Sequence, residues 1–142
     1  MVSTQFEVRA LLENWSEAAR MKDIDRLMSL YSPDIVYFDV VPPLQFVGSD
    51  AVRKNFLRWF DGYKSSIGLE IGGSSIVANG DTAAAFMLIR ASGTLQDGRN
   101  VGYWVRATVC CQRSDHNWVI THEHISLPVD FKTGWAVMNL TP

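Results

Sequence analysis

Apolar residues recur every three or four positions in three stretches of the first half of the chain, residues 4–21, 24–31 and 49–64. This spacing places the apolar side chains of each stretch on one face of a helix. Each stretch is therefore predicted to form an amphipathic helix that packs by that face.

Residues that can cap these helices stand at their predicted starts. Thr4 and Glu7 have the spacing of a capping box at the first start. Asp23 precedes the second stretch and Ser49 opens the third, and both side chains can accept a hydrogen bond from a helical N–H. Pro33 ends the second helix, because it disfavours helical geometry in the residue before it.

The rest of the chain has strand-like stretches bounded by turn residues. A β-rich run at residues 35–41 is stopped by Pro42-Pro43. Asn79-Gly80 and Asp97-Gly98 indicate tight hairpins. Four further strands are therefore predicted, at residues 69–77, 82–95, 101–113 and 118–126.

Helices followed by an antiparallel meander define an α+β domain, with the helices laid on one face of the sheet. The strands are long, and Gly72-Gly73 can bend or bulge the first of the four, so we expect a strongly curved sheet. Helices on its concave face leave a cavity at the open end. Ligand sites are mostly apolar concavities of this kind, with a few polar groups.

The composition fits one domain over residues 1–142. Of the 142 residues 47% are hydrophobic, which supports a packed core. The formal net charge of −2 includes no block of like charge, so no nucleic-acid partner is expected. No apolar run approaches the ~20 residues of a membrane span, and the first residues lack the pattern of a signal peptide. We therefore expect a cytoplasmic protein without membrane contact.

Two of the three histidines stand two residues apart on the predicted last strand. If this strand alternates regularly, His122, His124 and Ser126 share one face with Trp118 and Ile120. Two imidazoles and a hydroxyl on an apolar face have two interpretations. They are hydrogen-bonded polar groups of the core or rim, or they belong to a pocket with acid/base or metal chemistry.

Arg106 lies in the middle of a predicted strand, on the face that carries Trp104, Thr108 and Cys110. The opposite face is apolar, and a buried arginine is costly without a partner. In one arrangement Arg106 faces the cavity and holds a substrate carboxylate or enolate, or pairs with Asp39. In the other it lies in an ion pair on the outer face, and the apolar face is the helix-covered core.

Four segments, in this order, resemble the nuclear-transport-factor-2-like superfamily, which includes steroid Δ-isomerases and SnoaL-like polyketide cyclases. They are residues 21–25, 31–39, 46–48 and 118–126. The resemblance covers nearly the whole chain. It implies a cone-shaped fold, in which three N-terminal helices cover the concave face of a curved antiparallel sheet.

The resemblance also implies a role for Asp39, which matches the position of the general base in the steroid isomerases. A carboxylate at the mouth of an apolar cavity is suited to removing a proton next to a carbonyl. The alternative is a strand-end carboxylate that bonds local backbone N–H groups.

The chain departs from the steroid isomerases at the oxyanion hole. Those enzymes use a tyrosine on the first helix and a protonated aspartic acid on a central strand. The matching positions here hold Trp15 and, on the strand, Tyr103 or Trp104. Loss of those donors removes several kcal/mol of transition-state stabilisation, so the steroid reaction itself is not expected.

Some enzymes of the superfamily have an arginine on this strand that points into the cavity. This resemblance favours the same placement for Arg106. Arg106, with His122 or His124, would then supply the electrophile or the acid. The predicted catalytic residues are Asp39, Arg106, His122 and His124. The expected substrate contacts are the neighbouring aromatic and hydroxyl side chains Trp15, Tyr31, Phe38, Trp59, Tyr63, Trp104, Thr108 and Ser126.

The two histidines could also bind a metal, but a His-x-His pair needs a third or fourth ligand. Asp39 is one candidate, and Cys110 is another if the sheet register allows. The pattern is short and common, so neither a metal nor another cofactor is expected. Cys110 and Cys111 lie on opposite faces of a strand, and we expect both to be reduced.

Together these features predict a small-molecule enzyme with general acid/base chemistry on a hydrophobic carbonyl-type substrate, as an isomerase, cyclase, dehydratase or hydrolase. The alternative is a non-catalytic ligand-binding or dimerisation module of the same fold. An apolar outer sheet face needs cover, so we expect a homodimer through it, with Glu123 near the partner. The apolar C-terminal tail, residues 128–142, either lids the cavity or contacts that partner.

Overall fold

A computed structural model describes residues 3–142. The helices are α1 (Thr4–Arg20), α2 (Ile24–Met28) and α3 (Ser49–Asp61). The strands are β1 (Tyr31–Phe38), β2 (Phe46–Val47), β3 (Gly68–Asn79), β4 (Thr82–Thr94), β5 (Asn100–Ser114), β6 (Asn117–Ser126), β7 (Val129–Asp130) and β8 (Trp135–Ala136). The predicted order of helices and long strands is confirmed.

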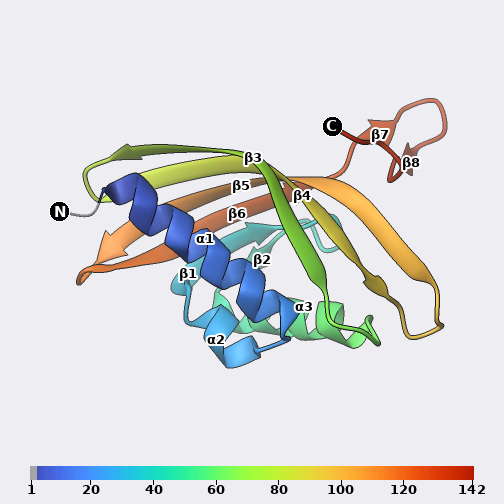
Figure 1. Cartoon of the computed structure of the whole chain (residues 1–142), viewed down its shortest axis with the longest axis horizontal. Coiled ribbons are helices and arrows are strands. Elements are labelled where there is room, and N and C mark those ends of the chain that lie inside the picture. Colours follow the sequence, from blue (N-terminus) through green and yellow to red (C-terminus); the bar gives the residue numbers. More distant parts are fainter. Residues whose placement is uncertain (1–2) are drawn as a thin grey trace.

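Six strands form one sheet in the order β2-β1-β6-β5-β4-β3. β3 to β6 form the predicted antiparallel meander, but β1 pairs with β6 in parallel, so the sheet is mixed and not purely antiparallel. Figure 1 shows the sheet curving over the helices, which lie on its concave side. The chain therefore has the expected cone-shaped α+β fold.

A bulge in β3 contributes to the curvature. The pairing with β4 shifts by one residue between Gly72 and Ser75, as the glycine pair predicted. Gly73 has a φ of +57°, which a residue with a Cβ rarely adopts. A Cβ on Gly72 would lie 3.1 Å from the ring of Trp104, so this position also lets a large side chain of β5 cross the outer face.

The helix caps differ from the predictions at two of three starts. Ser3 caps α1 by accepting a hydrogen bond from the backbone N–H of Phe6 at 3.2 Å, one residue before the predicted Thr4. α3 starts after Gly48 without a side-chain cap, so Ser49 is its first helical residue. Asp23 caps α2 as predicted, through the backbone N–H of Arg26.

A second bulge, in β6, determines which side chains enter the cone. Cys111 of β5 pairs with Ile120, whereas the next residue back, Cys110, pairs with His122. Thr121 is therefore an extra residue, and the alternation of side chains changes phase there. Ile120 and Glu123 consequently both point inward, although their spacing is odd.

The core lies between the concave face and the helices. Its large buried side chains come from every layer, among them Leu12 and Trp15 of α1, Phe56 of α3 and Ile120 of β6. β7 and β8 form a separate C-terminal hairpin that projects from the body on the side opposite the helices (Figure 1). Within residues 3–142, no helix has the length and hydropathy needed to cross a membrane.

Candidate functional site

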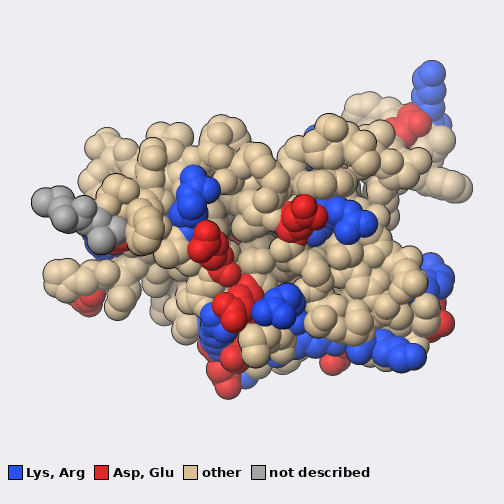
Figure 2. All heavy atoms as spheres, in the orientation of Figure 1, with Lys and Arg blue, Asp and Glu red and all other residues tan. Residues whose placement is uncertain are grey.

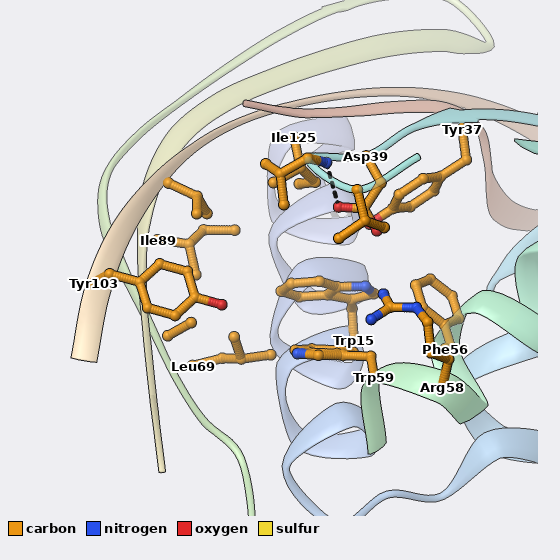
Figure 3. Close-up of a pocket in the computed structure, with 14 residues that line it drawn as sticks. Trp15, Tyr37, Asp39, Phe56, Arg58, Trp59, Leu69, Ile89, Tyr103 and Ile125 are labelled. Carbon is orange, nitrogen blue, oxygen red and sulfur yellow. Dashed lines mark hydrogen bonds between the residues drawn. The ribbon is translucent and has the colours of Figure 1, made fainter. Parts of the chain in front are cut away.

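A cavity of about 140 Å³ lies inside the cone, between the helices and the concave face of the sheet. Most of its lining is aromatic or aliphatic, and Figure 3 shows Trp15 of α1 at its centre, with Trp59 of α3 and Tyr103 of β5 around it. Asp39 and Arg58 add opposite charges to this apolar lining. No residue of the C-terminal hairpin lines the cavity, so the hairpin is not its lid.

Asp39 follows the end of β1 and lines the cavity, as predicted. Its Oδ1 accepts a hydrogen bond from the backbone N–H of Val40 at 2.7 Å. Its Oδ2 accepts one from the side-chain amide of Asn55 at 2.8 Å. The carboxylate therefore faces the cavity and also bonds local backbone, so the two interpretations of this residue are compatible.

Asn55 connects the carboxylate to a cation. It lies on α3, is only 4% exposed, and its Oδ1 accepts hydrogen bonds from Nε and Nη2 of Arg58 at 3.1 and 2.9 Å. Residues three apart on a helix lie on the same side, which brings Arg58 next to Asn55. Within residues 3–142, Arg58 forms no salt bridge, and Asn55 stands between it and Asp39.

Tyr103 supplies a hydroxyl group inside the cavity. It lies on β5, and its oxygen points toward the ring of Trp15 in Figure 3. Burial is the largest of the effects that raise the pKa of Tyr103 well above its usual value. The phenol is therefore neutral at all ordinary pH values and can donate a hydrogen bond.

A second polar cluster lies deeper, behind Trp15. The indole N–H of Trp15 donates to the hydroxyl of Tyr31 at 2.8 Å, and that hydroxyl donates to Oε1 of Glu123 at 2.6 Å. Glu123 is 1% exposed, and its Oε2 has no hydrogen-bond partner in the described part of the chain. Burial raises the pKa of Glu123 to about 7, against an opposing effect of the nearby Tyr31 and Tyr37 hydroxyls. The fold thus holds a carboxyl group that takes up a proton near neutrality.

The predicted placement of Arg106, His122 and His124 in the cavity is wrong. All three lie on the outer face of the sheet, in register with Ser126, Cys110 and Thr108 respectively. Arg106 is exposed and its Nε donates to the hydroxyl of Ser126 at 3.0 Å. Nδ1 of His122 lies 2.7 Å from the carbonyl oxygen of Val36, and His124 is exposed.

The physical reasons for this error differ between the two strands. On β5 the apolar face packs on the core and lines the cavity through Tyr103 and Val105. Arg106 is on the opposite face, so the arrangement that places it on the outside of the sheet is the correct one. On β6 the bulge at Thr121 reverses the alternation, so the histidines do not share a face with Ile120. The same phase change brings Glu123 inside, whereas we expected it on the outer face.

The expected substrate contacts divide in the same way. Trp15 and Trp59 line the cavity. Tyr31 and Tyr63 are buried in the core but do not line it. The remaining four lie on the outer face: Phe38, Trp104, Thr108 and Ser126.

Four polar residues in or behind the cavity were not predicted as site residues: Asn55, Tyr103 and Glu123, and also Arg58, which lines the cavity although it is exposed. In the sequence Arg58 falls among the charged residues of α3, as an ordinary solvent-facing side chain would. A signal for Glu123 does exist, because the large apolar residues Trp118 and Ile120 occupy even positions, whereas Ile125 and Leu127 occupy odd ones. Such a change of phase within a strand indicates a bulge.

The structure also bears on metal binding. Within residues 3–142, no group of three or more His, Cys, Asp or Glu side chains is placed to hold a metal ion. Cys110 and Cys111 are free thiols on opposite faces of β5, as predicted, one half-buried and one buried.

The fold agrees with comparisons to known proteins. The family model of the SnoaL-like domain matches residues 8–130, and the chain therefore belongs to this family, within the NTF2-like superfamily. Among curated proteins there is no significant match. Family membership establishes the fold but no particular reaction.

Solved structures extend this likeness. An NTF2-like protein of unknown function from Pseudomonas putida KT2440 is 33% identical, with a TM-score of 0.89 and all of both chains covered. A ketosteroid isomerase-like protein from Erwinia carotovora atroseptica is 18% identical, with a TM-score of 0.73, covering 84% of this chain and 92% of that one. An uncharacterised cystatin-like-fold protein from Caulobacter vibrioides is 17% identical, with a TM-score of 0.73, covering 89% and 90%.

Proposed function

We propose that the protein is a small-molecule enzyme that removes a proton from the carbon next to a carbonyl group, with Asp39 as the general base. The observation that carries this proposal is the pairing of Asp39 with Arg58 on one side of an apolar cavity. Asn55 bonds both, through its amide N–H and its carbonyl oxygen. A carboxylate can therefore accept the proton while a guanidinium stands near the developing negative charge.

Charge balance favours a neutral substrate. Before reaction Asp39 and Arg58 sum to zero charge, which suits an uncharged carbonyl compound. After proton transfer Asp39 is neutral, and the positive charge of Arg58 matches the enolate. Tyr103 can donate a hydrogen bond to another polar group of the substrate because its phenol stays protonated.

The size of the cavity favours a compact ring. An engineered protein cavity of about 150 Å³ holds one benzene molecule, and the cavity here is about 140 Å³. Four fused rings do not fit in this volume. We therefore propose a monocyclic or similarly small carbonyl compound, with its ring between Trp15, Trp59 and Tyr103 and its carbonyl toward Arg58.

Proton abstraction can be tested before the natural substrate is known. A panel of monocyclic ketones and enones is incubated with the protein in D₂O, and exchange of the proton next to the carbonyl is followed by NMR. We expect faster exchange for at least one compound, reduced by about 10²–10⁴-fold in Asp39→Asn. Asp34→Asn, which changes an exposed carboxylate on β1, the strand just before Asp39, serves as the matched control. Equal exchange rates in wild type and Asp39→Asn would contradict the proposal.

One observation favours the non-catalytic alternative. Both oxygens of Asp39 already accept hydrogen bonds, from Val40 and Asn55, so the carboxylate has structural partners without any substrate. On this alternative the cavity only binds an apolar ligand. Saturable binding of the same ketones without any proton exchange would support it.

A further inference from the structure

Glu123 is a buried carboxyl group that the proposed reaction does not use. The charged side chains visible in Figure 2 lie mainly over the helices, where water solvates them. Glu123 instead is 1% exposed, and its Oε2 is the only buried side-chain oxygen or nitrogen in residues 3–142 without a hydrogen-bond partner. Such an atom lowers the stability of a fold. A stabilising role alone therefore does not account for a carboxyl group at this position.

A second, smaller space inside the cone shows how Glu123 lies relative to the cavity. This void of about 10 Å³ is lined by Glu123 and otherwise by aliphatic and aromatic side chains. Trp15 and Ile89 line both the void and the 140 Å³ cavity. The indole of Trp15 therefore stands between the two spaces, with Glu123 on one side and the place of a ligand on the other.

Two hydrogen bonds connect Glu123 to this indole. Oε1 of Glu123 accepts from the hydroxyl of Tyr31 at 2.6 Å, and that hydroxyl oxygen accepts from the indole N–H of Trp15 at 2.8 Å. All three side chains are buried, and Tyr31 does not line the cavity. The N–H of Trp15 is thus engaged outside the cavity, so a ligand meets the carbon atoms of the indole ring.

We propose that Glu123 is a positioning residue for the cavity: through Tyr31 it fixes the ring of Trp15, against which an apolar ligand packs. The inference rests on the part of the proposed function that places a ligand ring against Trp15, and not on the removal of a proton. An ionised carboxylate accepts a stronger hydrogen bond than a neutral carboxyl group, and hydrogen bonds in a chain strengthen one another. The indole ring should therefore be held most firmly when Glu123 is ionised.

The groups that face Glu123 leave it as the one that changes charge near neutral pH. They are the hydroxyls of Tyr31 and Tyr37 from β1 and the thiol of Cys111 from β5. Burial raises the pKa of both tyrosines well above the usual value and that of Cys111 to about 12, whereas it raises the pKa of Glu123 to about 7. The side chains of α1 beside the void are not ionisable. Asp39, beyond the end of β1, is the remaining charged neighbour.

The first measurement is the indole N–H resonance of Trp15 in ¹⁵N-labelled protein, identified by its loss in Trp15→Phe. In the wild type we expect it to titrate with a midpoint near pH 7. Glu123→Gln keeps an acceptor for Tyr31 but cannot ionise, so the resonance should stay near the low-pH position of the wild type. Tyr31→Phe cuts the connection and should abolish the titration. Tyr37→Phe, which removes the other hydroxyl beside Glu123, should keep it.

The second measurement is the affinity of fluorobenzene, followed by its ¹⁹F resonance. A cavity of this size holds one benzene ring, and fluorobenzene has no charge and no acidic proton, so it reports on packing against Trp15. We expect about fivefold tighter binding at pH 8 than at pH 5.5, because the hydrogen bond to an ionised acceptor is the stronger one. Since coupling is reciprocal, saturating fluorobenzene should lower the midpoint of the Trp15 titration by about 0.7 pH unit.

Variants separate this role from a purely structural one. Glu123→Gln and Tyr31→Phe should each abolish the pH dependence of fluorobenzene affinity. Asp39→Asn, which removes the other nearby carboxylate, and Glu13→Gln, at an exposed position of α1, should keep it. A Glu123 that only supports the fold would change the free energy of unfolding in its variants without making the affinity of the wild type depend on pH.

Four results would overturn the proposal. A Trp15 resonance that does not titrate near pH 7 shows that Glu123 does not act on the indole. Loss of the pH dependence in Asp39→Asn assigns the effect to Asp39. Binding of fluorobenzene that is equal at pH 5.5 and pH 8 contradicts the positioning role alone. No binding at either pH contradicts both this role and the apolar ligand of the proposed function.

Discussion

The two faces of the sheet differ in how they hold polar groups. On the inner side Asp39 and Glu123 each belong to a hydrogen-bonded series. The first is Arg58–Asn55–Asp39 near the charged side of the cavity, with Arg58 exposed, and the second is Trp15–Tyr31–Glu123 behind it. On the outer side polar groups stand alone or in pairs, half-buried or exposed to solvent. The two histidines of β6, which the sequence suggested as site residues, are on the outer side.

The difference has an energetic meaning. A polar group on an exposed face stays hydrated, so a histidine there lowers the free energy of unfolding very little. A buried carboxyl without full hydrogen bonding costs on the order of 1–3 kcal/mol, and an apolar residue of similar shape would be more stable in its place. Buried polar groups such as Asn55 and Glu123 are therefore a better guide to the site than the density of ionisable residues along the chain.

Replacement of one arginine on each side of the sheet should give the largest difference in the rate of proton exchange. For any ketone that the wild type deuterates, Arg58→Gln should slow exchange by about 10²–10³-fold, because the enolate loses its cation. Arg106→Gln should have almost no effect, because that guanidinium lies on the outer face and does not line the cavity. NMR exchange rates measure both. A larger loss of exchange rate in Arg106→Gln than in Arg58→Gln would show that the reaction takes place on the outer face.

The pH dependence of stability should distinguish Glu123 from carboxylates at the surface. Burial raises the pKa of Glu123 from 4.5 to about 7, so the folded state binds its proton more tightly than the unfolded state does. The free energy of unfolding should therefore fall as the pH rises from about 4.5 to 7, by up to about 3 kcal/mol, and stay level above that.

Urea unfolding of wild type and Glu123→Gln at pH 5 and pH 8 measures this effect. The variant should lack the decline, because glutamine does not titrate. Glu13→Gln, at an exposed position of α1, should behave like the wild type. Parallel pH profiles for wild type and Glu123→Gln would show that Glu123 does not retain its proton in the folded state.

Removal of one hydroxyl group from each face of the sheet should give the smallest of these differences, measured as the free energy of unfolding. Tyr31→Phe deletes the group that donates to Glu123 and accepts from Trp15, which leaves two buried partners unpaired. We expect a loss of about 2 kcal/mol in the free energy of unfolding. Thr108→Val on the outer face should change it by less than ~0.5 kcal/mol. Chemical denaturation gives both values, and equal losses would mean that the buried series is not a special source of stability.

Periodicity predicted the helices and the meander because each buries one face, and Gly72-Gly73 indicated the β3 bulge. Asp39 was placed correctly in the cavity, since its position follows from the end of β1. The faces of β6 could not be obtained from regular alternation, because one inserted residue reverses them. Arg58 is exposed, as the helical pattern indicates, and its place at the cavity was missed because a cavity between a helix and a sheet exists only in three dimensions.

Thr121 has a consequence for changes in the length of β6. It is the extra residue of the bulge, so its deletion would restore plain alternation and keep Glu123 inward and the histidines outward. Deletion of a neighbouring residue between Thr121 and Glu123 that left the bulge intact would move Glu123 to the outer face. We therefore expect β6 to tolerate loss of one residue at Thr121 better than at the positions that follow it.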